Sequence, residues 1–201
     1  MVDFSEFEKL TNITFKNKDL LQQAFIHRSY INESTGSNLS HNERLEFLGD
    51  AVLELIVTDY LYNKYPDRDE GELTAYRSAL VNAVIIGEVA HELGMNEYLL
   101  LSKGEAKDAG RARSYILANT YEAYVGSVYL DQGYDVAQKF IAKTLFGKID
   151  VIVAKKLWRD AKSLVQEKAQ EYLNVTPSYK VLHEAGPDHD KHFTIGVFFA
   201  D

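Results

Sequence analysis

The sequence predicts a mainly α-helical protein in two parts: an all-helical domain over residues 1–157 and a smaller α+β module over residues 158–201. Apolar residues recur at helical spacing throughout the first part, and the alternation typical of strands is scarce there. After Pro177 the period changes, because two stretches alternate apolar and polar residues around the turn signal Gly186-Pro187-Asp188. The second part therefore reads as a helix, a strand, a hairpin loop and a second strand.

The helices of the first part are assigned from apolar spacing and from the polar residues between them. The segment Glu43–Tyr62 is apolar on nearly all sides from Ala51 onward, so we expect it to be central and buried. The other expected elements are a short N-terminal helix ending near Thr11-Asn12, then Leu20–Tyr30, one or two helices within Glu70–Leu93, a loop at Gly104–Gly110, and helices at Ser114–Leu130 and Val136–Leu145.

The second part is predicted to begin with an amphipathic helix over Lys155–Leu173. Alternation places Tyr179, Val181 and His183 on one face of the first strand. Phe193, Ile195, Val197 and Phe199 share one face of the second strand. Two strands without a covering helix cannot bury such a face, so we expect this module to be incomplete and its residues to be mobile or to self-associate.

The amino-acid composition limits the metals and partners that the chain is expected to bind. The chain has no cysteine, so any metal must be held by oxygen or imidazole, which favours Mg²⁺ or Mn²⁺. The N-terminus lacks the basic stretch of a signal peptide, and no apolar run approaches the roughly 18 residues of a membrane span, so we expect a cytoplasmic protein with no membrane partner. The net charge of −8 argues against nucleic acid. A carboxylate-rich metal site is itself acidic, however, and we expect the chain to stop before a basic segment.

Carboxylates form a stripe on the helix predicted over residues 43–62. Glu43, Glu46 and Asp50 are three and four residues apart, so they lie on one helical face and repel one another. One interpretation is an acidic surface in water, and Glu54 continues the stripe. The other is a cation site, favoured because the stripe runs into an apolar helix, where unpaired carboxylates are costly.

A second helix offers matching groups. Asn119 and Glu122 are three residues apart, and the small residues Ala118 and Gly126 follow a four-residue step through Glu122. Small residues let another helix approach closely. Packing the two helices together would gather four oxygen-bearing side chains, which suits octahedral Mg²⁺.

The segment Asn42–Ala51 resembles the signature of the ribonuclease III family nearly letter for letter, and further segments agree in the family's order over essentially the whole chain. These are His27–Tyr30, Glu70–Thr74, Ala79–Asn82, Lys103–Glu105, Ile116–Asn119 and Glu122-Ala123.

The resemblance implies an all-helical endonuclease domain that dimerises. It implies that Glu46, Asp50 and Glu122 are metal ligands, with Asp50 and Glu122 catalytic, and that Glu43 is a supporting acid. It also implies that Phe47 lies at the dimer contact, although a plain core aromatic is the alternative.

One position departs from the family pattern. Asn119 stands where relatives usually carry Asp, so it offers a metal a carbonyl oxygen without charge. We interpret this as a modulation of Mg²⁺ binding and keep Asn119 among the expected ligands. Arg111 and Arg113, just before this helix, either contact phosphate or are merely exposed.

The second part resembles the start of a double-stranded RNA-binding domain, without the third strand and the lysine-rich final helix. In that family the first helix and the first hairpin loop enter successive minor grooves and read shape and 2′-hydroxyls. The resemblance implies RNA contacts for Gln166, Glu167, Pro187 and His189. A surface helix and an ordinary turn are the alternatives.

Together these observations predict a homodimeric endoribonuclease that hydrolyses double-stranded RNA with Mg²⁺, leaving 5′-phosphate and 3′-hydroxyl ends. Mn²⁺ is expected to substitute, and maturation of ribosomal RNA precursors is an expected role. The alternative is a catalytically silent RNA-binding or ribosome-associated protein on the same fold. Asn119 and the missing C-terminal elements favour it, and the retained Glu46, Asp50 and Glu122 argue against it.

Overall fold

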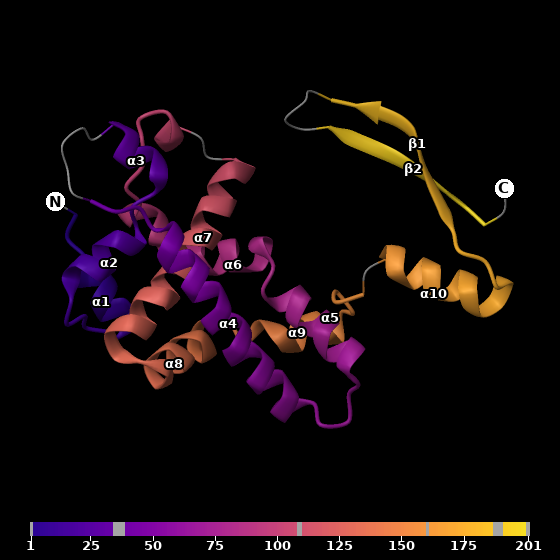
Figure 1. The fold of residues 1–201 in the computed structure, drawn as a ribbon, viewed down its shortest axis with the longest axis horizontal. Coiled ribbons are helices and arrows are strands. Elements are labelled where there is room, and N and C mark those ends of the chain that lie inside the picture. Colours follow the sequence, from indigo (N-terminus) through magenta and orange to yellow (C-terminus); the bar gives the residue numbers. More distant parts are fainter. Residues whose placement is uncertain (1, 34–38, 108–109, 160, 187–190, 200–201) are drawn as a thin grey trace. The chain divides into compact units, whose positions relative to one another are not determined.

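The computed structural model describes residues 2–33, 39–107, 110–159, 161–186 and 191–199. The chain divides into two compact units, Met1–Trp158 and Arg159–Asp201, and each is treated by itself. The first unit is helical (Figure 1). Its helices are α1 Ser5–Thr11, α2 Lys18–Ala24, α3 Arg28–Glu33, α4 Glu43–Lys64, α5 Glu70–Leu80, α6 Ala83–Glu92, α7 Arg111–Gln132, α8 Tyr134–Thr144 and α9 Lys148–Ala154, with 3₁₀ turns η1 Met95–Tyr98 and η2 Glu105–Lys107.

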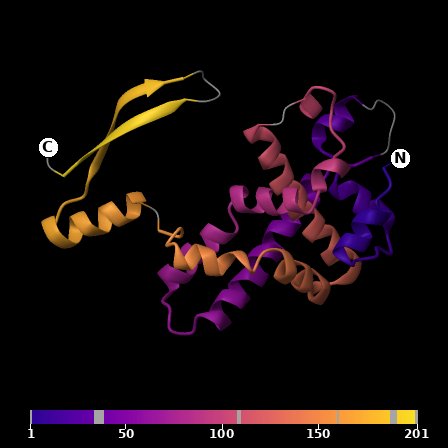
Figure 2. The ribbon, with the colours of Figure 1, turned by 180° about the vertical axis from the view of Figure 1, so that it is seen from behind.

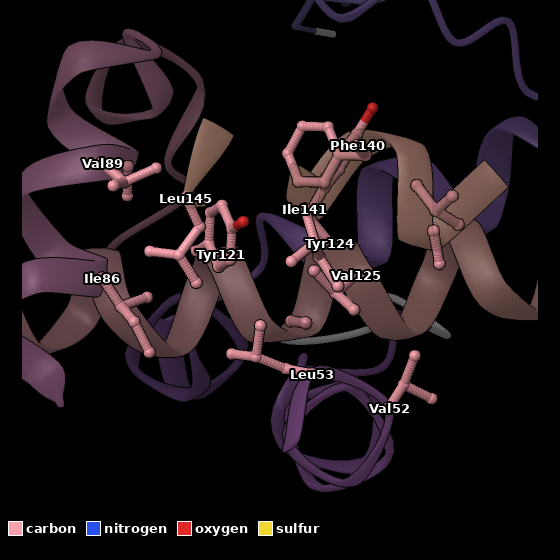
Figure 3. Close-up of a cluster of buried hydrophobic side chains, with 14 of the residues drawn as sticks. Val52, Leu53, Ile86, Val89, Tyr121, Tyr124, Val125, Phe140, Ile141 and Leu145 are labelled. Atoms are coloured by element: carbon pink, nitrogen blue, oxygen red, sulfur yellow. The ribbon is translucent and has the colours of Figure 1, made fainter. Parts of the chain in front are cut away.

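The core of this unit is built around α4 and α7, which are 22 residues each and cross at its centre (Figure 1, Figure 2). Helix α6 packs against α7, and α8 covers the other end of α7. Figure 3 shows the side chains that meet there. They are Val52 and Leu53 of α4, Ile86 and Val89 of α6, Tyr121, Tyr124 and Val125 of α7, Phe140 and Ile141 of α8, and Leu145, all buried. The expected central position of the 43–62 helix is thus confirmed.

Two glycines let α4 and α7 touch backbone to backbone. A Cβ atom built on Gly49 would lie 1.7 Å from the carbonyl oxygen of Glu122, and one on Gly126 would lie 2.3 Å from that of Leu45. Neither helix has room for even a methyl group at the crossing. The close approach expected at Gly126 is confirmed, and Gly49 supplies its counterpart.

One expected helix is broken by a pairing that is remote in sequence. Leu20–Tyr30 was predicted as a single helix, but α2 ends at Ala24 and α3 begins at Arg28. Between them, Ile26 forms a parallel β-bridge with Leu100. The extended pairing satisfies backbone groups that a helix would otherwise use, and helical spacing alone does not reveal it.

The helix predicted over Lys155–Leu173 is also shorter than expected. Helix α9 ends at Ala154, Lys156 has a left-handed backbone with φ of 54°, and α10 spans Ala161–Leu173. The stretch before α10 belongs to the first unit's surface, where the ring of Trp158 meets Tyr76 edge-on at 5.0 Å between centroids.

The second unit holds α10 and an antiparallel hairpin of β1 Ser178–Ala185 and β2 His192–Phe198. Tyr179 lies opposite Val197 and Val181 opposite Ile195, as alternation predicts. The register then shifts, so His183 lies opposite Thr194. The prediction that His183 shares a face with Tyr179 and Val181 is therefore wrong, because Leu182 is an extra residue in a bulge.

The apolar face of the hairpin is exposed, as the sequence predicted. Phe193 and Ile195 each keep more than half of their surface in contact with solvent, and Val197 and Phe199 about two fifths. Among the described helices, none alone is long and apolar enough to cross a membrane; α5 and α6 reach that length and composition only as a pair bent by 44°.

The close contact between α4 and α7 predicts that a methyl group added at Gly126 destabilises the fold. Gly126→Ala should lower the free energy of unfolding by roughly 2–3 kcal/mol, because the methyl group would overlap the carbonyl oxygen of Leu45. Gly147→Ala is the control, since a Cβ at Gly147 meets nothing within 4 Å and its φ of −62° suits alanine. Urea unfolding followed by circular dichroism measures both. Equal midpoints for the two variants would contradict the close crossing.

Candidate active site

The glycine crossing brings the acidic residues of α4 and α7 together. Glu46 lies three residues before Gly49 and is half-buried, whereas Asp50 is exposed immediately after it. On α7, the carbonyl of Glu122 faces Gly49, and the Glu122 side chain is half-buried between the fully buried Tyr121 and Ala123. The side chains flank the point where the two backbones touch.

The pKa values show that these carboxylates act on one another. Burial, with Asp50 and Glu46 nearby, raises the pKa of Glu122 from the ordinary 4.5 to about 7. Burial, followed by the charges of Glu43 and Asp50, raises the pKa of Glu46. Burial and the charge of Glu54 raise that of Asp50. Desolvation is the largest cause in each case, and like charges add to it.

Among the residues that the structure describes, these three acids differ from Glu43 in having no counter-charge. Glu43 lies 3.8 Å from Arg28 and 3.7 Å from Nδ1 of His41. Within the part of the chain that the structure describes, Glu46, Asp50 and Glu122 form no ion pair or hydrogen bond, and only like charges act on them. Glu43 is thus a neighbour of the site with partners of its own.

The donor set fits a hard divalent cation in its chemistry. Carboxylates whose pKa values are raised by burial and by neighbouring like charge gain most from a cation, which removes both the repulsion and the cost of burying charge. In their present conformations, no three acidic or imidazole groups among the described residues converge closely enough to enclose an ion. Binding would therefore need the side chains to turn toward a common point.

The remaining predicted residues of the first unit take varied positions. Asn119 is exposed on α7, one turn before Glu122. Phe47 is 82% exposed, so its interpretation as a core aromatic is wrong for the single chain. Arg113 donates to the carbonyl oxygen of Glu105 at 2.7 Å and to Asn96 at 3.1 Å, so its guanidinium fastens the preceding loop to α7. The side chain of Arg111 lies outside what the structure describes.

On the second unit, Gln166 and Glu167 are exposed on α10 and line an open groove of about 700 Å³. Four residues that the sequence reasoning missed line it too: Ser163, Gln170, Glu171 and Thr176. Ser163 and Gln170 stand three residues before and four after Gln166, so helical spacing was the available signal. Pro187 and His189 lie outside the described residues.

Comparison with known proteins agrees with this architecture. A family model described as Ribonuclease-III-like matches residues 17–149. The ribonuclease 3 of Protochlamydia amoebophila is 47% identical over 188 residues, which are 94% of this chain and 77% of that protein. That of Listeria innocua is 45% identical over 98% of this chain and 86% of its own length.

Solved structures show the same likeness. The nuclease domain of ribonuclease III from Campylobacter jejuni superposes with a TM-score of 0.64 at 34% identity, covering 72% of this chain and 94% of that one. Dicer from Pichia stipitis superposes with a TM-score of 0.52 at 25% identity, covering 90% and 80%. Fold and site define a helical nuclease with a second, smaller unit. The chain belongs to the ribonuclease III family, which confirms the predicted fold class and endoribonuclease activity.

The raised pKa of Glu122 predicts a pH dependence of stability. With a pKa of about 7 in the folded chain and an ordinary 4.5 in the unfolded one, Glu122 stabilises the fold fully below about pH 4.5, and this contribution is lost as pH rises through 7. In chelator, the Tm of the wild type should fall by roughly 5 °C more than that of Glu122→Gln between about pH 5 and pH 8. Calorimetry of both proteins tests this, and parallel Tm curves would contradict the assignment.

Proposed function

We propose that this endoribonuclease cuts double-stranded RNA in a Mg²⁺-dependent reaction, with Glu46, Asp50, Glu122 and Asn119 as the metal-binding side chains. The observation that carries this proposal is the set of three carboxylates at the helix crossing, each subject to neighbouring negative charge and without a counter-charge in the described chain. An acidic surface without a function would not keep Glu122 half-buried next to Glu46 and Asp50, because burial of an unneutralised carboxylate is costly.

Both central helices contribute residues to the proposed metal site. Glu46 and Asp50 supply charge from α4, and Glu122 supplies it from α7, where its backbone is held against Gly49. Held by Glu46, Asp50 and Glu122, Mg²⁺ would supply the Lewis acidity that makes a water nucleophilic and that offsets negative charge on the leaving 3′-oxygen. Without metal, burial raises the pKa of the Glu122 carboxyl to about 7, so Mg²⁺ binding near neutral pH would displace its proton. The products expected are 5′-phosphate and 3′-hydroxyl ends, in the maturation of structured cytoplasmic RNA such as ribosomal precursors; Mn²⁺ is expected to substitute.

RNA binding is assigned to the groove along α10. Gln166 and Gln170 carry carboxamides, which both donate and accept hydrogen bonds, and Ser163 adds a hydroxyl. Groups of this kind suit the 2′-hydroxyls of an RNA minor groove, which are donors and acceptors themselves. The groove therefore supports a duplex RNA partner, with Pro187 and His189 of the hairpin loop as further proposed contacts.

The central experiment is cleavage of a long RNA duplex with and without Mg²⁺. Glu122→Gln should lower the cleavage rate by roughly 10²–10³-fold, because it removes a charged ligand from the proposed metal-binding set. Glu88→Gln, which changes an exposed acid on α6, is the control and should cut at the wild-type rate. Duplex binding without any cleavage by the wild type would favour the catalytically silent alternative.

Asn119 gives a second prediction. Replacing it with Asp adds a negative charge beside Glu122, and Mg²⁺ prefers charged oxygen, so the Mg²⁺ concentration at half-maximal rate should fall. In chelator the added like charge should lower the Tm, and Mg²⁺ should restore it. Titration of Mg²⁺ against initial rate compares the two proteins; an unchanged midpoint would remove Asn119 from the metal-binding set.

A homodimer is proposed through α4. Phe47 is 82% exposed and Leu55, eight residues along the same helix, is 59% exposed, so an apolar surface stands beside the acidic residues. Light scattering should give about twice the chain mass of 22.8 kDa. Phe47→Asp should give monomers, whereas Leu10→Asp, at an exposed leucine of α1, should not. A monomeric wild type that cuts both strands would refute this.

A further inference from the structure

Helix α4 is preceded by an asparagine, Asn42, whose side chain does not cap the helix. Asn17 and Asn82 precede α2 and α6, and the side-chain oxygen of each accepts a hydrogen bond from backbone N–H groups of the following turn. This is the usual role of asparagine at this position. Asn42 makes no such bond. Its buried side chain, 3% exposed, instead donates from Nδ2 to the carbonyl oxygen of Ala24 at 3.1 Å.

The backbone of Asn42 strengthens the same attachment. Its N–H donates to the carbonyl oxygen of Ile26 at 2.9 Å, and its own carbonyl accepts from the N–H of Glu46 at 2.9 Å. Asn42 is thus hydrogen-bonded to the extended stretch between α2 and α3 at two points, Ala24 and Ile26. Because its carbonyl also accepts from Glu46, the same residue connects this stretch to the first turn of α4.

The stretch 24–27 is held from its other side by the segment that leads to α7. Leu100 donates to the carbonyl oxygen of Phe25 at 2.9 Å and accepts from the N–H of His27 at 3.0 Å. Farther along that segment, Arg113 of α7 donates to the carbonyl oxygen of Glu105. The stretch therefore connects the beginning of α4 with the beginning of α7.

Two of the contacts that hold the first turns of α4 lie on either side of Glu46. The crossing at Gly49 is one point, and Asn42, about 10 Å away along the helix at 1.5 Å per residue, is the other. Glu46 lies between them. If the attachment at Asn42 were lost, a tilt of roughly 10° of these turns about Gly49 would move Glu46 by somewhat under 1 Å. Displacements of that size in a catalytic group cost up to about a hundredfold in rate.

We propose that Asn42 is a positioning residue for cleavage: its buried carboxamide, donating to Ala24, holds α4 at the tilt that sets Glu46 against Glu122 of α7. The inference rests on the proposed site. It assigns Asn42 no contact with RNA or metal.

Aspartate at position 42 separates this role from helix capping. Asp is as good a cap as Asn, and its charge favours a helix N-terminus, so capping alone predicts a neutral or stabilising effect. A carboxylate cannot donate, however, and would set its oxygens against the buried carbonyl of Ala24. The positioning role therefore predicts a loss where capping predicts none.

The experiment compares Asn42→Asp and Asn42→Ser with Asn82→Asp in the full chain. Asn82 is the matched control, because its oxygen accepts from Val84 and Ile85 and its exposed Nδ2 contact with Ala79 is replaceable by water. Initial rates on an RNA duplex give kcat and KM at a temperature well below each Tm, and Tm is measured in EDTA.

Asn42→Asp should lower kcat by about tenfold to a hundredfold with KM nearly unchanged, and should lower the Tm in EDTA by roughly 5 °C. Asn42→Ser restores ordinary capping without adding charge, so it should keep more of the Tm and still lose kcat. Asn82→Asp should match the wild type in both.

A folded Asn42→Asp with wild-type kcat overturns the proposal. If Asn42→Asp does not fold, Asn42→Ser decides alone: reduced kcat at unchanged KM supports the proposal, and wild-type kcat overturns it. Failure of the proposed function looks different, since the wild type itself would then leave the duplex uncut.

Discussion

The contact on which the rest of this structure depends is the meeting of two helix backbones at Gly49 and Gly126. A methyl group at either position would overlap a carbonyl oxygen of the other helix. This closeness lets Tyr121, Tyr124 and Val125 of α7 complete the same buried core as Val52 and Leu53 of α4. The contact between α4 and α7 therefore determines both the packing of the core and the positions of the acidic residues, so a change in one changes the other.

The same contact creates the electrostatic cost of the site. Glu46, Asp50 and Glu122 are brought together where burial and like charge raise their pKa values, and in the described chain no cation offsets this. Hydrophobic packing holds together groups that repel. The apo fold is thus poised to gain stability from whatever neutralises the carboxylates, which links metal binding to folding.

Away from the crossing, hydrogen bonds between distant segments hold the ends of the two helices. Asn42 attaches α4 to the stretch 24–27, Leu100 attaches the same stretch to the segment before α7, and Arg113 fastens that segment to α7 itself. The second unit depends on a different balance, because its hairpin exposes Phe193 and Ile195, and its described polar groove lies on α10.

The sequence by itself determined the class of fold, the two long central helices and the acidic residues at three- and four-residue spacing, because helical periodicity is local information. It also marked Gly126 as a point of close approach. It did not reveal the bridge between Ile26 and Leu100, the bulge at Leu182 or the inward turn of Arg113, since each depends on a partner remote in the chain or across a strand. The asparagines at 17, 42 and 82 look alike in sequence, and only the tertiary structure decided that Asn42 donates to Ala24 while the others cap, because that carbonyl is brought to it by the fold.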